Sequence, residues 1–406
     1  MRTINEQLST PVRDHADVIV VGGGVAGAAA AVAARRQGAD VLIMEKSALF
    51  GGLATNGLIS WYEPLCDGEG TQLMYGLPEE LLRLSVRYGP DTLPEAWKGR
   101  LAPDGSSEAV PGKKDPAGGR YATHFLPAAL QLALDEWLLK EGVRIRLCMS
   151  GVRPVMEGSL CRGIIAESVS GREAFTAEAV IDATGDASVL YRAGVPCEEG
   201  KNYFTFIARE AGADGPDSAF PLSWHSFGAN LFGKGHPEGY PLVSGTDNAE
   251  ETDFLLEGRK QLLAQIRGQD RDGKGVFVLP SQAQFRTSRR LSGGYTLREG
   301  DNHAARERSV ALVCDFKRPG AWYELPFECL YHPAFPNLLA AGRMISAEGW
   351  AWDVTRIIPG CAASGEAAGT AAALAVRKGT EPGRLDIRIL QKCLRDGGVR
   401  IHREEA

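Results

Sequence analysis

The feature that most constrains this chain is a glycine-rich turn between a β-branched run and an alanine-rich run. Residues 17–21 form a short apolar run that predicts a buried strand. The turn at residues 22–27 follows at once, and residues 28–36 predict a helix that ends at Gly38. A second apolar strand at residues 41–44 then leads into Glu45. This strand–helix–strand unit of about 30 residues predicts a right-handed parallel crossover.

The turn has the composition of a nucleotide pyrophosphate site. A helix N-terminus offers partial positive charge and free N–H groups, and glycines allow a phosphate to approach them. Gly22 and Gly24 allow the tight turn, Gly27 allows close packing of the helix, and Glu45 is placed to hold a ribose hydroxyl. An ordinary glycine turn of an α/β protein is the alternative, which the flanking strand, helix and acid disfavour. Glutamate at position 45 favours NAD or FAD over NADP and leaves those two open.

Composition excludes several other classes of protein. The 406 residues, 44% hydrophobic and 24% charged, predict two or three globular domains. A net charge of -6 gives no attraction for nucleic acid or an anionic membrane, and the N-terminus lacks the apolar core of a secretory signal. The 8 scattered cysteines lack the spacing of zinc or iron–sulfur sites, so we expect no metal and a reduced, cytoplasmic protein. The 49 glycines form an excess without a repeat.

The remaining chain leaves the first unit and later returns to it. Residues 126–138 predict a helix with one apolar face, and residues 103–119, rich in glycine and proline, predict a mobile surface loop. Residues 201–335 lack strand–helix alternation and carry most of the aromatic residues and histidines, which predicts a second, mixed domain. Strands of a β-meander are predicted at residues 143–147, 152–156, 163–167 and 174–181.

Further motifs follow the glycine turn in a fixed order. The paired Gly51-Gly52 is followed by the segment 180–186, with Ala183-Thr184-Gly185, and by the segment 337–343, which ends in Gly342-Arg343. These segments resemble the cofactor motifs of the FAD-dependent oxidoreductases, a bacterial family in the glutathione-reductase-like superfamily with two dinucleotide-binding domains. The resemblance extends from residue 16 to about residue 378. The turn itself matches the superfamily's extended fingerprint at Gly22, Gly24, Gly27, Ala31, Ala34, Gly38, Val41 and Glu45.

The resemblance implies an α/β fold that binds FAD noncovalently. Its discontinuous Rossmann-like FAD-binding domain, a parallel sheet plus a β-meander, would comprise residues 16–60, 120–200 and 335–380. A second, mixed α+β substrate or cap domain would comprise residues 61–119 and 201–334, followed by a C-terminal tail at residues 381–406. The cofactor-binding residues that it implies are Gly22, Gly24, Val25, Ala26, Gly27, Glu45, Lys46, Gly51, Gly52, Leu53, Ala54, Val152, Thr184, Gly185, Asp186, Gly342, Arg343, Cys361 and Ala362.

A late helix is predicted from about Cys361 to Lys378, directly after Pro359-Gly360. Its start offers free N–H groups that can stabilise negative charge. In the flavoproteins that this sequence resembles, such a helix points at the pyrimidine edge of the flavin and stabilises the reduced ring. A tightly packed alanine-rich helix is the alternative interpretation, and both can hold. At this position Cys361 would have a lowered pKa if it were exposed.

Flavin chemistry needs a group that transfers one proton and a group that holds the substrate. His225 is our candidate for proton transfer, with a structural histidine as the alternative. Arg286 and Arg289 are candidates for holding a carboxylate or polarising a carbonyl, with an arginine network between domains as the alternative. Trp350 and Trp352 stand where relatives carry histidine or small polar residues, and they indicate an apolar substrate surface.

We therefore expect an FAD-dependent oxidoreductase that transfers a hydride between a small organic substrate and the flavin N5. The alternatives are a biosynthetic or transferase enzyme that does not turn its dinucleotide over, and a flavin-binding sensor. No second Rossmann motif for a pyridine nucleotide is visible, which favours direct reduction of the flavin by substrate. We expect no nucleic-acid or membrane partner, and the sequence is compatible with a homo-oligomer.

Overall fold

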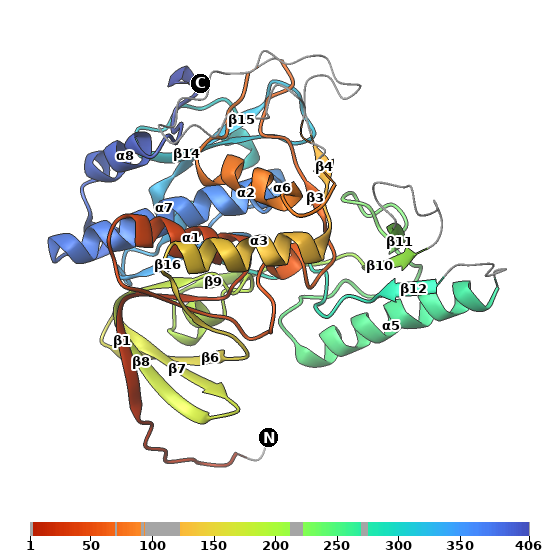
Figure 1. Cartoon of the computed structure of the whole chain (residues 1–406), viewed down its shortest axis with the longest axis horizontal. Coiled ribbons are helices and arrows are strands. Elements are labelled where there is room, and N and C mark those ends of the chain that lie inside the picture. The colour runs from red at the N-terminus through yellow and green to blue at the C-terminus, as the bar shows by residue number, and fades with distance from the viewer. Residues whose placement is uncertain are drawn as a thin grey trace.

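One sheet organises the larger part of the chain (Figure 1). The computed structural model describes residues 3–69, 71–90, 93, 122–211, 222–268 and 275–405. Within this part the main sheet has 7 strands in the order β5-β2-β1-β8-β7-β6, with β16 paired to β8. Its strands are β1 (Val12–Val21), β2 (Val41–Met44), β5 (Arg144–Arg146), β6 (Ser150–Glu157), β7 (Leu160–Ser168), β8 (Gly171–Asp182) and β16 (Leu338–Ala340).

The sheet has a parallel half and an antiparallel half that share β8. Strand β1 pairs in parallel with β2 and β8, β2 pairs with β5, and the end of β8 pairs with β16. The first half of β8 pairs antiparallel with β7, which pairs with β6, so these three strands form the predicted β-meander. The strand predicted at residues 143–147 does not belong to it, because β5 pairs in parallel with β2 at the other edge of the sheet. Strands from three distant parts of the chain thus meet in one sheet. The predicted fold class, with a discontinuous Rossmann-like domain, is confirmed.

The parallel strands end at one edge of the sheet. The register places Val21 opposite both Met44 and Asp182, and Asp182 opposite Ala340. In an open α/β sheet, ligands bind in the crevice outside the carboxyl ends of the strands. This edge is therefore the first place to look for a site.

Eight α-helices are described, and two of them, α1 and α7, cross closely on the sheet (Figure 1). A Cβ atom on Gly365 would lie 2.3 Å from the Ala26 carbonyl oxygen, and one on Gly369 would lie 2.1 Å from that of Ala30. Glycines four residues apart on α7 therefore let its backbone approach α1 more closely than any side chain would allow. The helices are α1 (Val25–Arg36), α2 (Leu77–Val86), α3 (Pro127–Lys140), α4 (Ser188–Arg192), α5 (Asn248–Arg267), α6 (Gly349–Thr355), α7 (Ile358–Lys378) and α8 (Ile387–Asp396).

A smaller hydrophobic cluster lies apart from the main sheet, around β10, β11, β12 and α5 (Figure 1, right). The three strands form an antiparallel sheet in the order β11-β10-β12. The cluster contains Phe204, Phe206, Ala208, Val243, Phe254, Leu262, Ala283 and Phe285. The other strands are β3 (Trp61–Tyr62), β4 (Thr123–His124), β9 (Cys197–Glu199), β10 (Thr205–Ala211), β11 (Leu222–Gly228), β12 (Gly275–Val278), β13 (Arg289–Leu291), β14 (Ser309–Cys314) and β15 (Trp322–Pro326).

The larger hydrophobic cluster extends beyond the sheet and its crossing helices. It includes buried residues of β14, β15 and α8, among them Leu390 and Leu394. Residues 309–326 and the described part of the C-terminal segment, residues 381–405, therefore pack with the helices of the main sheet, while the domain boundaries stay a prediction. The loop predicted at residues 103–119 lies outside the described residues.

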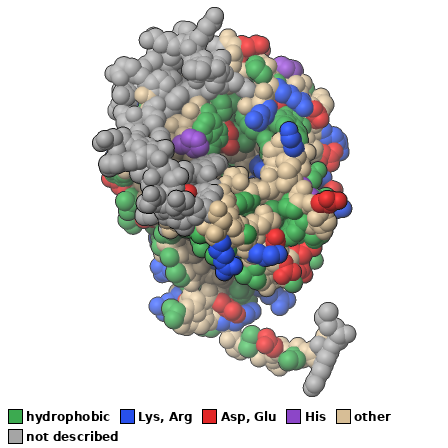
Figure 2. Space-filling view, turned by 90° about the vertical axis from the view of Figure 1, so that its right-hand side faces the viewer, with side chains coloured by type: hydrophobic (Ala, Val, Ile, Leu, Met, Phe, Trp, Pro, Cys, Tyr) green, Lys and Arg blue, Asp and Glu red, His purple; other side chains and the backbone are tan. Residues whose placement is uncertain are grey.

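The distribution of surface charge and the polarity of the helices test the expectation of no nucleic-acid or membrane partner. Figure 2 shows basic and acidic side chains interspersed on one face, with neither sign gathered in one area. In the part of the chain that the structure describes, no helix is both long and apolar enough to cross a membrane.

Candidate functional site

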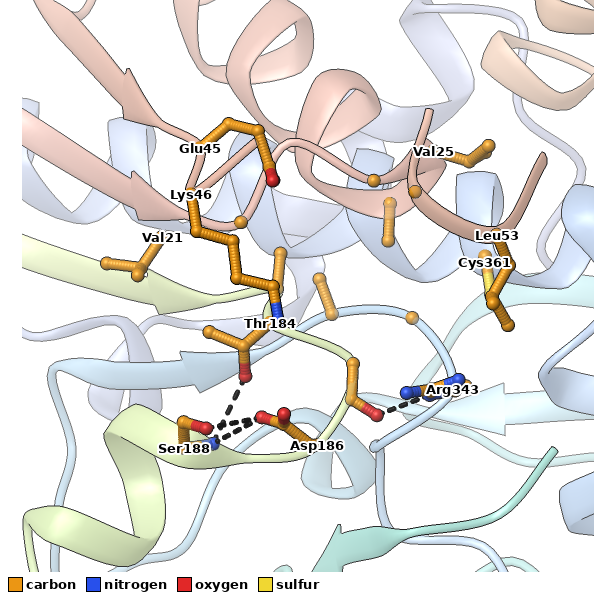
Figure 3. Close-up of a pocket in the computed structure, with 18 of the residues that line it drawn as sticks. Val21, Val25, Glu45, Lys46, Leu53, Thr184, Asp186, Ser188, Arg343 and Cys361 are labelled. Atoms are coloured by element: carbon orange, nitrogen blue, oxygen red, sulfur yellow. Dashed lines mark hydrogen bonds between the residues drawn. The ribbon is translucent and has the colours of Figure 1, made fainter. Parts of the chain in front are cut away.

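A cavity of about 360 Å³ opens at the carboxyl edge of the parallel strands (Figure 3). Of the predicted cofactor-binding residues, all except Gly27 and Ala362 line it. The ends of the strands contribute Val21, Met44, Ala183 and Ala341 to its wall. The sheet thus brings the predicted motifs, which are far apart in the sequence, to one hollow.

The glycine turn forms the middle of the wall. The first N–H groups of an α-helix have no acceptor within the helix. At the start of α1 no side chain caps these groups either. Gly22 has a φ of 103°, and a Cβ atom there would lie 2.4 Å from the Ala183 oxygen. Among the residues that the structure describes, no atom lies within 4 Å of a Cβ atom placed on Gly24, so a side chain there would enter the cavity. Gly27 packs behind the wall, where a Cβ atom would lie 1.9 Å from the Gly22 oxygen.

Glu45 lies at the end of β2 and lines the cavity with a buried side chain. Its Oε2 atom accepts the Gly23 N–H at 2.6 Å, and its Oε1 atom accepts the Ser47 N–H at 2.8 Å. The carboxylate therefore fixes the glycine turn from the adjacent strand and still presents free lone pairs to a ligand. Figure 3 shows the Lys46 side chain pointing across toward Thr184.

The loop after β8 is fixed by the buried carboxylate of Asp182. Its Oδ1 atom accepts the Thr184 N–H and hydroxyl at 3.0 and 2.7 Å. Its Oδ2 atom accepts the N–H groups of Val189 and Leu190 at 2.8 and 2.9 Å. Burial nevertheless raises the pKa of Asp182 to about 6. This network sets the path of residues 183–188 along the cavity (Figure 3).

Arg343 joins three parts of the chain at the cavity wall. Its guanidinium donates to the Gly185 oxygen and, at 2.6 Å, to the Phe285 oxygen. The adjacent Gly342 N–H donates to the Ser364 hydroxyl of α7 at 2.9 Å. Because Phe285 belongs to the smaller cluster, Arg343 connects that cluster to the main sheet and to the cavity.

The start of α7 forms another part of the wall through Ile358 and Cys361. Helix α7 begins three residues before the predicted start, and Ala362 is fully buried behind the wall. Burial raises the pKa of the Cys361 thiol to about 12, so the lowered pKa expected for an exposed thiol does not apply. Arg356 also lines the cavity, and its Nε atom donates to the Asp353 carboxylate at 2.9 Å.

The predicted catalytic residues lie outside the cavity wall or are only partly described. His225 lies in β11 opposite Ala208, and the structure describes its backbone only. Arg286 donates to two carbonyl oxygens, and burial with the nearby Arg356 charge lowers its pKa to about 10. Arg289 lies 3.9 Å over the Tyr191 ring. Neither arginine lines the cavity, and both connect separate segments.

The two tryptophans of α6 do not form an open substrate surface. Trp350 and Trp352 are both buried, at 9% and 8% exposure. The Trp350 indole donates to the Asp315 carboxylate at 2.5 Å, and that of Trp352 donates to the Arg343 oxygen. Trp352 thus packs against the cavity wall at Arg343, and Trp350 packs against the Phe232 and Phe316 rings. Because both indoles are buried in these contacts, the expectation of a substrate surface at these residues is wrong.

Several residues of the site carry no signal in the sequence. Gln282 and Arg192 line the cavity. Neither could be predicted, because each is an isolated polar residue outside any motif. Gln282 is brought there by its neighbours, because the Ser281 N–H donates to the Asn56 oxygen at 2.9 Å. The Gln284 amide donates to the Gly57 oxygen at 2.6 Å. The segment 281–284 thus lies against the loop that follows Gly51-Gly52.

Comparison with known families gives one decisive match. Residues 17–207 and 244–394 match the family described as FAD dependent oxidoreductase. The chain belongs to this family. It is therefore an FAD-dependent enzyme. A search of curated proteins found no match.

The solved structures that resemble this FAD-dependent oxidoreductase are distant in sequence. CabE, an aromatic hydroxylase from angucycline biosynthesis, is 16% identical, with a TM-score of 0.47 over 94% of this chain and 65% of that one. The p-nitrophenol 4-monooxygenase PnpA from Pseudomonas putida is 13% identical, with a TM-score of 0.48 over 94% and 84%. The myxobacterial halogenase CndH is 14% identical, with a TM-score of 0.42 over 94% and 78%. The chain thus spans 65% of the length of CabE.

The residues of the cavity fit FAD. Gly24 leaves a cradle that any side chain would fill, at a helix start with free N–H groups for a pyrophosphate. Glu45 supplies a carboxylate for ribose hydroxyls beside it. The start of α7 and Arg356 offer positive charge to a ring that becomes negative on reduction.

Proposed function

We propose that this cavity holds FAD noncovalently and that the enzyme oxidises or reduces a small organic substrate by hydride transfer. The observation that carries the proposal is that the starts of two long helices, α1 and α7, line one cavity at the carboxyl edge of the sheet (Figure 3). One helix start suits the pyrophosphate, and the other suits a reduced flavin ring. A cavity for a mononucleotide would need only the first.

Each part of the wall has a proposed role. The start of α1 with Gly24 would hold the pyrophosphate, and Glu45 the adenosine ribose. The loop 183–186 and Arg343 would lie along the part of FAD that joins the pyrophosphate to the flavin ring. The start of α7 would lie at the ring itself. When bound, FAD supplies two-electron chemistry at its N5 atom.

The chain itself would position the substrate and exclude water. Leu53 and Ile358 supply apolar surface beside Gln282, where the segment 281–284 meets the loop after Gly51-Gly52. We propose that the substrate lies there, between the smaller cluster and the cavity. His225 remains the proposed proton-transfer residue and Arg286 a proposed substrate-holding residue, because β11 and the Ala229 oxygen that Arg286 contacts belong to that side of the molecule. Arg289, whose guanidinium lies over the Tyr191 ring, remains the other proposed substrate-holding residue.

Anaerobic absorbance spectroscopy with a panel of small metabolites tests this function. We expect one class of metabolite to bleach the flavin band rapidly and an artificial electron acceptor to restore it. NADH or NADPH alone should not bleach it quickly, because the sequence shows no second dinucleotide motif. A flavin that dithionite bleaches but no donor or acceptor turns over would instead support a sensor or a structural dinucleotide.

A further inference from the structure

A carboxyl group lies directly behind the cavity wall at the start of α7. Glu63 follows β3, and its Oε2 atom accepts the N–H of Ile358, the first residue of α7, at 3.3 Å. Ile358 and Cys361, one turn further on, both line the cavity. The carboxyl group of Glu63 therefore shares the helix start that we propose for the flavin ring, without reaching the cavity itself.

The charged and titratable groups that face Glu63 come from both sides of this contact. Arg356 precedes α7, Cys361 belongs to its first turn, and Tyr62 belongs to β3. Arg356 is shared with Asp353, so it neutralises Glu63 only in part. Burial raises the pKa of Glu63 to about 7, against the opposing effects of the Ile358 N–H and the Arg356 charge. Both charge states of Glu63 are thus accessible near neutral pH.

We propose that Glu63 is a positioning residue that sets the reduction potential of the bound flavin by taking up a proton when the flavin is reduced. An ionised Glu63 opposes the partial positive charge of the helix start, which would otherwise stabilise a reduced, negative ring. Bound FAD, when reduced by its substrate or by a dye, would take up two electrons from that donor and one proton, and one further proton would pass from solvent to the Glu63 carboxylate. No covalent bond to the protein forms. The inference rests on the proposed position of FAD and not on any substrate.

The reduction potential of the FAD-loaded protein, measured between pH 5.5 and 8.5 against reference dyes, tests the proposal. Above pH 7 we expect the wild-type equilibrium constant for flavin reduction to fall by an additional factor of ten per pH unit, because one extra proton is taken up. The reduction potential should therefore fall by about 30 mV more per pH unit than it would without this proton. Glu63→Gln keeps an oxygen for the Ile358 N–H but cannot ionise. It should leave the potential unchanged below pH 6, raise it above pH 7, and lose the extra dependence.

Two variants separate this role from a structural one. Glu63→Asp can still ionise, so its reduction potential should retain the extra pH dependence at a shifted pH. This variant also tests the proposal if Glu63→Gln does not bind FAD. Glu366→Gln is the matched control, because Glu366 is a buried carboxylate on α7, eight residues or about 12 Å along the helix from Ile358 and outside the cavity wall. It should leave the pH dependence intact.

A wild-type pH dependence of the potential in Glu63→Gln with FAD bound one to one, or loss of the extra pH dependence in Glu63→Asp, would overturn the proposal. Failure of the wild type to bind FAD would refute the proposed function instead.

Discussion

Three buried carboxylates lie at the cavity or on its helices, and they differ in how many hydrogen bonds they accept. Asp182 accepts four hydrogen bonds and Glu45 accepts two from backbone N–H groups, so each organises a turn at the cavity. Glu366 accepts one, from the Leu77 N–H at 2.9 Å, at the start of α2. Burial therefore dominates at Glu366 and, with the nearby Glu80 charge, raises its pKa to about 8.

The hydrogen bonds of Glu45 predict the effect of removing its charge. Glu45→Gln leaves one carbonyl oxygen where two oxygens accept N–H groups, so the turn loses a charge-assisted bond of roughly 1.5–3 kcal/mol. We expect FAD affinity to fall by about 10- to 100-fold in equilibrium titrations. Glu178→Gln, at a surface carboxylate with 56% side-chain exposure, is the control and should bind normally. Equal affinities would show that Glu45 does not contribute to the site.

Glu366 predicts a pH dependence of stability. Its pKa is about 8 in the folded protein and about 4.5 in the unfolded chain, so the unfolded state binds fewer protons between these values. The contribution of Glu366 to the free energy of unfolding therefore falls as pH rises from 4.5 to 8. Glu366→Gln keeps an acceptor for Leu77 but removes this loss. Chemical denaturation should show the variant gaining stability relative to wild type across that window, and a pH-independent difference would contradict the assignment.

At the level of elements, the crossing of α1 and α7 brings two helix starts to one cavity. Alanines on both helices and the glycines at 365 and 369 let the backbones approach, so these two of the 49 glycines serve close packing of helix against helix. Gly369→Val would place atoms against the Ala30 carbonyl oxygen. We expect a loss of roughly 1–3 kcal/mol in the free energy of unfolding.

Chemical denaturation measures this loss, and Gly275→Val supplies its control. A Cβ atom on Gly275 would meet no atom of the described residues within 4 Å, and the residue is exposed in β12. The control should therefore unfold like the wild type. Equal stability of Gly369→Val and the control would mean that the helices do not cross as closely as described.

The sequence predicts these elements best where local pattern and tertiary role coincide. Strand β2 occupies the predicted residues 41–44, and the meander strands and α3 overlap their predicted ranges. Helix α5 was not predicted, although Asp247 caps it by accepting the N–H groups of Ala249 and Glu250. Its apolar stripe is sparse, since its described buried residues are Phe254, Gly258 and Leu262. A mostly polar helix gives little periodic signal.

At the level of the whole molecule, the site is assembled from segments that only the fold brings together. The glycine motifs could be predicted because each is contiguous in the sequence and has a fixed local geometry. Glu63 could not, because its partner Ile358 is 295 residues away. Arg286 and Arg289 look like an isolated basic cluster in the sequence, yet in the fold they contact carbonyl oxygens and an aromatic ring from distant segments, and neither lines the cavity.

Titration of Gly24→Val with FAD measures whether FAD occupies this cavity. Because a Cβ atom on Gly24 would clash with none of the described residues, the variant should fold like the wild type while its side chain occupies the proposed pyrophosphate cradle. We predict that the wild type and Gly275→Val bind one FAD per chain, released by acid without a covalent remnant, and that Gly24→Val loses at least 100-fold in affinity. A folded Gly24→Val protein that binds FAD as tightly as the wild type would contradict the account.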